Sequence, residues 1–229
     1  MATGGLSARG SAILPLRDLL PQTASALFPG IYTQGPPEAV YLTFDDGPHP
    51  EFTPRIVELL GRYQSQGTFF LLSSALNRWY EGATLLYETS QSLGFHGDRH
   101  HPFPGMNFKK LKERLRCLWD QFPPFISQRL VGIRPPYGRV TPALYLWAKG
   151  NNIPIILWSR SFADWRGAVN LSQVRRIAQR VRGGEILLLH DGGRGALQTL
   201  KILPLILETL KERGWSLRGL PPYRLLWSR

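Results

Sequence analysis

Short apolar runs alternate with longer amphipathic segments over most of the chain. The apolar runs lie at 39–42, 68–72, 130–133, 154–158 and 185–189, and a last one lies near 215–217. Runs of this length with few polar positions are typical of strands that are buried on both faces of a sheet. The pattern therefore predicts six or seven short strands.

The segments between these runs have helical spacing. In the first segment, apolar residues from Ile56 to Tyr63 recur every three or four positions after Thr53-Pro54, which we interpret as an N-cap and a first helical turn. Strands that alternate with helices indicate parallel βαβ units, either in an α/β barrel or in an open α/β sheet. Further helices are predicted at 81–92, 107–122, 141–150, 171–181 and 203–213.

Ionisable residues that are unusual for a buried segment follow the predicted strands. In a parallel barrel the carboxyl ends of all strands open on one face, where enzymes of this architecture keep their active sites. We therefore expect six side chains to converge there, namely Asp45, Asp46, His96, Arg134, Asp164 and His190.

The composition is that of one globular domain with a large core. The chain has 229 residues, of which 43% are hydrophobic and 19% charged. Residues 1–38 mix Gly, Pro and Ser with short apolar pieces, so we predict an irregular N-terminal arm packed on a catalytic domain formed by 39–229. No internal repeat or linker divides that domain.

Charge adds a possible class of partner. Lys and Arg number 28 against 16 Asp and Glu, a net charge of +12, which attracts anionic polymers, nucleic acid or an anionic membrane surface. No nucleic-acid-binding motif organises the basic residues. No span approaches the roughly 20 apolar residues of a transmembrane helix, and the N-terminus lacks the apolar core of a secretory leader. The default expectation is a soluble, cytoplasmic protein.

The single cysteine, Cys117, excludes an intrachain disulfide framework and a thiolate metal cluster. Its place in an amphipathic segment favours a structural role over the alternative, a catalytic thiol.

The adjacent carboxylates Asp45 and Asp46 have two interpretations. Neighbouring carboxylates repel each other unless a cation lies between them, but a solvated Asp-Gly turn has the same sequence. His96 and His100 are four residues apart and can bind one metal if their loop is tightly turned, although two surface histidines are the alternative. With Asp46 they would form a set of two nitrogens and one oxygen, which leaves positions open for water and suits zinc, cobalt, nickel or manganese.

Five short motifs carry most of this chemistry. They are Thr43-Phe44-Asp45-Asp46-Gly47-Pro48, His96-Gly97-Asp98-Arg99-His100, Arg134-Pro135-Pro136-Tyr137-Gly138, Asp164-Trp165 and Leu188-Leu189-His190-Asp191. In these motifs and their order, the chain from about Ala39 to Leu217 resembles the polysaccharide deacetylases, the NodB-like or family-four carbohydrate esterases. The resemblance implies a distorted (β/α) barrel of about seven parallel strands in a single domain.

The first two motifs imply the base and the metal ligands. By resemblance, Asp45 is the general base, and Asp46, His96 and His100 hold one divalent metal, with zinc first and cobalt, nickel or manganese as alternatives. Gly97 stands where the family has Ser or Thr. A hydrogen bond that holds the metal loop would be lost there, which puts the metal affinity in question.

The other three motifs imply the remaining catalytic groups. Arg134 would hold the base, and the backbone N–H of Tyr137 would help to stabilise the oxyanion. Asp164 would be the charge partner of His190, the general acid. Trp165 and Leu188 would form a small apolar pocket for the acetyl methyl group. The sequence departs from the family at Ser161, where an Asp is usual, and we interpret His49, His101 and Asp191 as loop residues without a ligand role.

The function implied is a metal-dependent hydrolase that removes N-acetyl groups from amino sugars in an N-acetylated glycan or oligosaccharide and releases acetate. One alternative is a related hydrolase of O-acetyl esters or of a non-sugar C–N bond, since one fold hosts several substrates. The other is a non-catalytic, basic glycan-binding protein on the same scaffold.

Overall fold

One parallel sheet organises the residues that the computed structural model describes, which are 28–103, 108–127 and 130–222. The sheet has eight strands in the order β1-β6-β5-β4-β3-β2-β8-β7. All neighbouring strands are parallel. The strands are β1 (Ile31–Tyr32), β2 (Tyr41–Asp45), β3 (Gly67–Leu72), β4 (Ser92–Gly97), β5 (Leu130–Ile133), β6 (Ile155–Ile156), β7 (Arg160–Ser161) and β8 (Ile186–His190).

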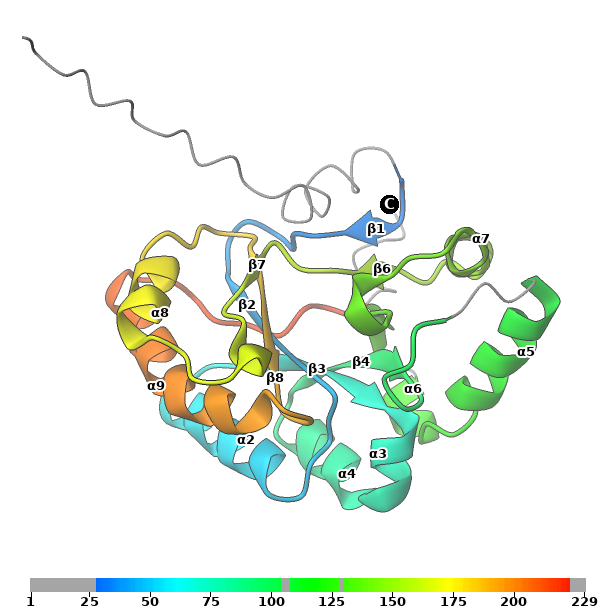
Figure 1. The fold of residues 1–229 in the computed structure, drawn as a ribbon, viewed down its shortest axis with the longest axis horizontal. Coiled ribbons are helices and arrows are strands. Elements are labelled where there is room, and N and C mark those ends of the chain that lie inside the picture. Colours follow the sequence, from blue (N-terminus) through cyan, green and yellow to red (C-terminus); the bar gives the residue numbers. More distant parts are fainter. Residues whose placement is uncertain (1–27, 104–107, 128–129, 223–229) are drawn as a thin grey trace, which may run out of the picture.

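The sheet curls, and β1 and β7 are its two open edges (Figure 1). The fold is therefore a distorted, incomplete (β/α) barrel, which confirms the predicted class, with eight strands in the described residues instead of about seven. The helices are α2 (Phe52–Arg62), α3 (Ser73–Arg78), α4 (Glu81–Glu88), α5 (Phe108–Trp119), α6 (Pro124–Ser127), α7 (Pro142–Gly150), α8 (Leu171–Ala178) and α9 (Ala196–Glu212), with short 3-10 turns η1 (Pro136–Gly138) and η2 (Asp164–Arg166).

Strands that lack an apolar run were missed by the pattern. The most important is β4, whose first residue we assigned to the end of a helix at 81–92 and whose remainder we treated as a loop. This strand contains Gly94 and His96, which are both buried but not hydrophobic, so the strand does not form an apolar run in the sequence. At the other extreme, the strand predicted near 215–217 is reduced to one bridge between Leu217 and Val40.

Several helix boundaries differ from the prediction, and the starts of α2 and α9 differ for reasons that the structure shows. Helix α2 begins at Phe52, so Thr53 lies inside it and its hydroxyl donates to Asp191 instead of capping the helix. Helix α9 begins at Ala196, several residues before the predicted start, and contains Pro204. A proline inside a helix costs about 3 kcal/mol. The helix continues through it because Ile202, Leu203, Ile206 and Leu207 are all buried against the sheet domain.

The larger core cluster packs strand residues against the helices, and a smaller cluster includes Tyr41, Phe70 and Ile156 of the sheet. Strands β2, β3 and β8 are buried along their whole length. Phe44 and Phe69 stack with ring centroids 4.8 Å apart and are fully buried. Truncating such a buried Phe to Ala typically costs about 3–5 kcal/mol. This packing fixes β2, which ends at the adjacent carboxylates.

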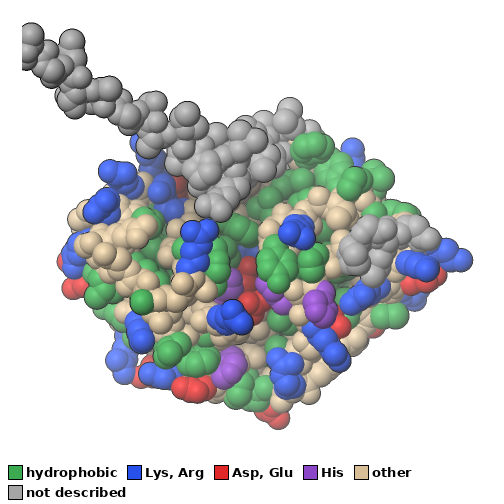
Figure 2. Space-filling view, in the orientation of Figure 1, with side chains coloured by type: hydrophobic (Ala, Val, Ile, Leu, Met, Phe, Trp, Pro, Cys, Tyr) green, Lys and Arg blue, Asp and Glu red, His purple; other side chains and the backbone are tan. Residues whose placement is uncertain are grey.

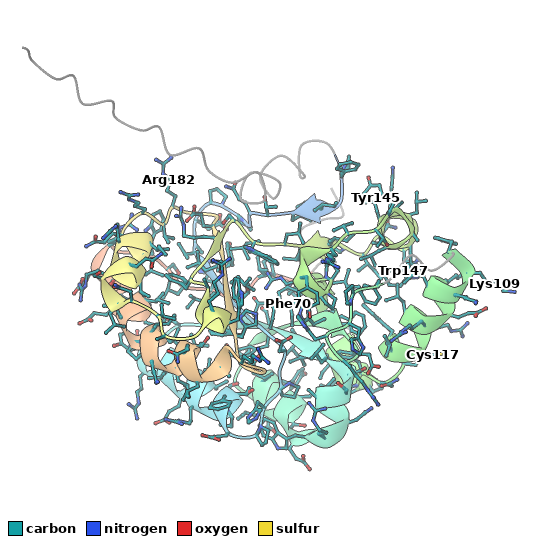
Figure 3. The ribbon with its side chains drawn as sticks, in the orientation of Figure 1. Phe70, Lys109, Cys117, Tyr145, Trp147 and Arg182 are labelled. Atoms are coloured by element: carbon teal, nitrogen blue, oxygen red, sulfur yellow. The ribbon has the colours of Figure 1, made fainter. Side chains whose placement is uncertain are left out.

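The predicted N-terminal arm is described only in part, because residues 1–27 lie outside the described residues. Residues 28–38 include β1, which pairs with β6 at one edge of the sheet. Cys117 lies on α5, within the amphipathic segment where the sequence placed it, and its side chain is exposed (Figure 3). Among the described helices, none has both the length and the apolar character that crossing a bilayer requires.

Candidate active site

Parallel register brings the predicted residues together. Asp45 at the end of β2 is directly opposite His190 at the end of β8. On the other side, the N–H of Arg134 donates to the carbonyl of Phe95 at 2.8 Å, which places His96 beside Arg134. The side chains therefore meet because the strands that carry them end at the same level of one sheet.

Asp46, His96 and His100 form a possible metal site. One ligand atom from each residue lies within 4.8 Å of the other two. The Oδ1 atom of Asp46 is 3.5 Å from Nε2 of His96 and 3.5 Å from Nε2 of His100. Asp46 and His100 have positive φ angles of 76° and 55°. Strained backbone of this kind is held by the surrounding structure at functional sites, and here it turns both side chains toward His96.

The chemistry of these atoms fits a metal ion. His96 donates from Nδ1 to the carbonyl oxygen of Arg134 at 2.7 Å, so Nε2 keeps its lone pair. Nε2 of His96 and Oδ1 of Asp46 are buried and have no hydrogen-bond partner among the described residues. Burial and the neighbouring His96 lower the pKa of His100, although Asp46 opposes them, which favours the neutral imidazole that binds metals. A cation between these atoms would satisfy all three.

Asp45 has a different partner from Asp46. Its Oδ1 accepts a hydrogen bond from Arg134 at 2.7 Å, and its side chain is almost fully buried. Burial alone would raise the pKa of Asp45, but the charges of Arg134, His96 and His190 and the hydrogen bond from Arg134 lower it. Asp45 is therefore ionised at neutral pH and can accept a proton.

The guanidinium group of Arg134 is fixed by several hydrogen bonds and by an aromatic contact. It is fully buried, and its remaining donors reach the hydroxyl of Thr43 at 2.8 Å and the carbonyls of Ile156 and Leu157 at 3.1 and 2.9 Å. Its guanidinium carbon lies 3.9 Å from the ring centroid of Phe70, near the middle of the fold (Figure 3). A planar cation fixed in this way orients the Asp45 carboxylate.

His190 and Asp164 form a second pair. Nδ1 of His190 is 3.0 Å from both carboxylate oxygens of Asp164, which is fully buried. Thr199 on α9 donates to Oδ2 of Asp164 at 2.6 Å. Burial would lower the pKa of His190, but the hydrogen bond and charge of Asp164, with the charges of Asp45 and Asp46, raise it to about 9. The imidazole is therefore protonated at neutral pH. Its Nδ1–H faces Asp164, and its Nε2–H does not contact that carboxylate.

The other predicted site residues surround these groups. Tyr137 has a φ of 58° in η1, is 61% exposed, and its ring centroid lies 4.4 Å from that of His100. Trp165 is 38% exposed and lies 5.4 Å from His190 between ring centroids. Leu188 is buried on β8, between Thr43 of β2 and Ser161 of β7.

Sequence reasoning missed three residues that position the site. Thr43 contacts Arg134, and Thr199 contacts Asp164. Thr43 is the first residue of the first motif but had no predicted role, and Thr199 lies inside helix α9 without a sequence signal. Asp191 was interpreted as a loop residue, but it is fully buried. Its Oδ2 accepts from Thr53 at 2.6 Å, and its N–H donates to the carbonyl of Asp45 at 3.0 Å. Burial and the charges of Asp46 and Asp45 raise its pKa to about 7. His49 and His101 take no part in the metal set.

Two departures from the family pattern have local explanations. Gly97 has a φ of 99°, a conformation that residues with a Cβ rarely adopt. The loop after it is held instead by Ser73 and Ser74, whose hydroxyls contact the side-chain and backbone oxygens of Asp98 at 3.1 and 2.5 Å. The Ser161 hydroxyl accepts from the N–H of Ala163 at 3.0 Å and so supports the turn before Asp164.

The chain is similar to known deacetylases over most of its length. The family model for polysaccharide deacetylases matches residues 33–154. A peptidoglycan-N-acetylglucosamine deacetylase from Bacillus cereus is 30% identical over 178 residues, covering 77% of this chain and 83% of that protein. A chitooligosaccharide deacetylase from Azorhizobium caulinodans is 25% identical, covering 80% and 93%. A crystal structure of a peptidoglycan N-acetylglucosamine deacetylase superposes with a TM-score of 0.78 at 25% identity, covering 88% and 94%. The chain belongs to the polysaccharide deacetylase family.

Proposed function

We propose that the protein is a metal-dependent hydrolase that removes N-acetyl groups from amino sugars of a glycan and releases acetate. The observation that carries the proposal is the cluster of Asp46, His96 and His100, in which two buried ligand atoms lack partners beside an ionised Asp45. The relatives act on peptidoglycan and chitooligosaccharides. N-acetylglucosamine is therefore the first sugar to test.

Asp46, His96 and His100 would hold the metal. When bound, a divalent ion of this kind supplies Lewis-acid polarisation of the acetyl carbonyl and of a water molecule. A set of two imidazoles and one carboxylate leaves coordination positions open, which is the mark of a catalytic rather than a structural site. Zinc comes first, and cobalt, nickel and manganese share its preference for these ligands.

Asp45 acts as the general base. It takes the proton of the attacking water at the carboxylate oxygen that Arg134 does not engage, and Arg134 keeps the carboxylate ionised and oriented. Proton transfer by a positioned side chain contributes typically 10²–10⁴-fold to the rate. The backbone N–H of Tyr137 stabilises the negative charge that develops on the carbonyl oxygen, and a donor of this kind is worth about 3 kcal/mol.

His190 acts as the general acid. Asp164 accepts from Nδ1, so the proton that goes to the leaving amine comes from Nε2. The amine needs this proton because an unprotonated amide nitrogen is a poor leaving group. Leu188 and Trp165 supply apolar surface next to His190 that suits the acetyl methyl group.

The test is acetate release from chitotetraose by protein loaded with zinc, compared with the same protein in chelator and with acetylated xylan as substrate. We expect release from chitotetraose, its loss in chelator, and both metal binding and turnover lost in His96→Gln. The matched control is His101→Gln, which removes an exposed histidine outside the metal set. Release from xylan alone would favour an esterase, and zinc binding without any turnover would favour a non-catalytic glycan-binding protein.

A further inference from the structure

Two exposed aromatic rings flank the proposed site. Tyr137 stands beside His100, and Trp165 stands beside His190, at ring-centroid distances of 4.4 and 5.4 Å. The two rings therefore border different parts of the catalytic group. Rings of this kind offer an apolar face that packs on a sugar, while the polar part of the residue stays in water.

An arginine side chain lies next to each of these two aromatic rings. The guanidinium carbon of Arg139 lies 5.7 Å from the ring centroid of Tyr137, and that of Arg166 lies 5.9 Å from the ring centroid of Trp165. Both arginines are exposed. Neither forms an ion pair with a carboxylate of the described residues. The two guanidinium groups are thus placed by aromatic contacts and keep their hydrogen-bond donors free of acidic partners there.

Two further arginines lie on the other loops of the site. Arg99, between the two predicted histidine ligands, has a side chain that is 75% exposed and only a distant contact, 4.0 Å, with Asp98. Arg194 is exposed and follows Gly193, whose Cβ position would lie 3.0 Å from Oδ2 of Asp46. Among the acidic residues of the site, Asp45 and Asp164 are buried, and the side chain of Asp46 is 14% exposed. Figure 2 shows acidic and histidine side chains gathered near the middle of this face, with Lys and Arg side chains around them.

We propose that the glycan deacetylated by this protein is anionic, with carboxylate or phosphate groups on the sugars next to the reacting N-acetyl group. Arg139 and Arg166 bind these groups, while Tyr137 and Trp165 pack on the sugar rings. A guanidinium presents a planar fork of donors that matches the two oxygens of a carboxylate or phosphate. A neutral chitin chain would leave these donors without a charged partner. The inference rests on the proposed deacetylation and specifies its substrate class.

The general basicity of the protein is the competing explanation, because a net charge of +12 attracts any anion. A matched pair of variants separates the two. Arg139→Gln/Arg166→Gln removes two charges at the site, and Arg175→Gln/Arg176→Gln removes two exposed charges on α8. Both double variants lower the net charge by two, but only the first removes charges at the site, because α8 carries none of the five motifs.

The substrates are four tetrasaccharides. One is chitotetraose, one is chitotetraose phosphorylated at a 6-hydroxyl, and one alternates N-acetylglucosamine with N-acetylmuramic acid. The fourth is the same alternating glycan with its carboxylates converted to methylamides. We expect a higher kcat/KM for the anionic glycans than for their neutral counterparts. The ratio of kcat/KM for an anionic glycan to kcat/KM for its neutral counterpart should fall about four-fold or more in Arg139→Gln/Arg166→Gln, since each exposed charged contact contributes about two-fold or more. The same ratio should stay unchanged in Arg175→Gln/Arg176→Gln.

The outcomes are distinct. A preference for only one anionic glycan identifies the carboxylate or the phosphate as the recognised group. An equal fall in both double variants, or no preference for charge, overturns the inference. If no glycan is deacetylated, the proposed function fails. Calorimetric titration of Asp45→Asn protein with the same glycans then decides the inference alone, since tighter binding of the anionic glycans supports it and equal binding contradicts it.

Discussion

Replacing Asp164 with Asn tests the electrostatics of the proposed acid most sharply. The substitution keeps the size of the side chain and removes the charge that faces Nδ1 of His190 at 3.0 Å. Asp164, aided by Asp45 and Asp46, raises the pKa of His190 from 6.5 to about 9 against the effect of burial. An opposite charge at this distance accounts for shifts of about one to three units. We expect the pKa of His190 to fall by about two units in Asp164→Asn.

The same shift is a statement about stability. A pKa that is raised on folding stabilises the folded state fully below the unfolded value of 6.5, and this contribution is lost as the pH rises through about 9. At about 1.4 kcal/mol per unit, it is worth about 3 kcal/mol for a side chain as buried as His190. The difference in unfolding free energy between wild type and Asp164→Asn should therefore shrink as the pH is raised from 6 to 10.

Two measurements on metal-free protein check this reasoning. NMR titration of the His190 ring gives the pKa directly, and urea denaturation at each pH gives the stability difference. Taking the difference between the two proteins cancels other groups that titrate in this range, such as Asp191, whose pKa is raised to about 7. A wild-type His190 that titrates near 6.5, or a stability difference that does not change with pH, would refute the account of this pair.

Three further substitutions have expected outcomes. Arg134→Met leaves Asp45 buried without its cation and should lower the free energy of unfolding, measured by urea denaturation, by about 3–5 kcal/mol. The double variant Arg134→Met/Asp45→Asn should be more stable than Arg134→Met alone, and equal stability would contradict a direct pairing of the two side chains. Gly97→Ser introduces the residue that the family has, but at a φ of 99°, so it should lower the free energy of unfolding by about 1–3 kcal/mol. A stabilised protein would contradict the positive φ at position 97. Thr53→Val removes the hydroxyl that donates to Asp191 and should cost about 1–3 kcal/mol, and an unchanged midpoint in denaturation would mean that this buried contact is absent.

The sheet was predictable where strands are buried on both faces by aliphatic residues. Strand β8, with three consecutive leucines, shows directly as an apolar run. Strand β4 was not found because its buried positions include Gly94 and His96, whose burial serves close packing and the site. The helix predicted at 203–213 is shorter than α9, which contains Pro204, and only the buried residues on both sides of this proline show that the helix continues through it.

The site was predictable to the extent that the motifs carry it. The adjacency of Asp45 and Asp46 raised the question of their partners. The structure pairs Asp45 with Arg134 at 2.7 Å and places both histidines 3.5 Å from Asp46, with His96 also 3.7 Å from Asp45. Thr199 could not be predicted, because it reaches Asp164 across 35 positions of sequence from inside a helix. The buried state of Asp191 depends on Thr53, which sequence alone made a helix cap. The roles of these residues and the cytoplasmic location stay predictions.

The central claim is that the adjacent carboxylates divide into one metal ligand and one base. The direct measurement is zinc content and acetate release from chitotetraose for wild type and Asp45→Asn, with the exposed Glu113→Gln on α5 as the control for losing one carboxylate. We predict that Asp45→Asn keeps wild-type zinc stoichiometry and loses at least about 10²-fold in turnover, the usual contribution of a general base, while the control is unaffected. Full turnover in Asp45→Asn would contradict the account.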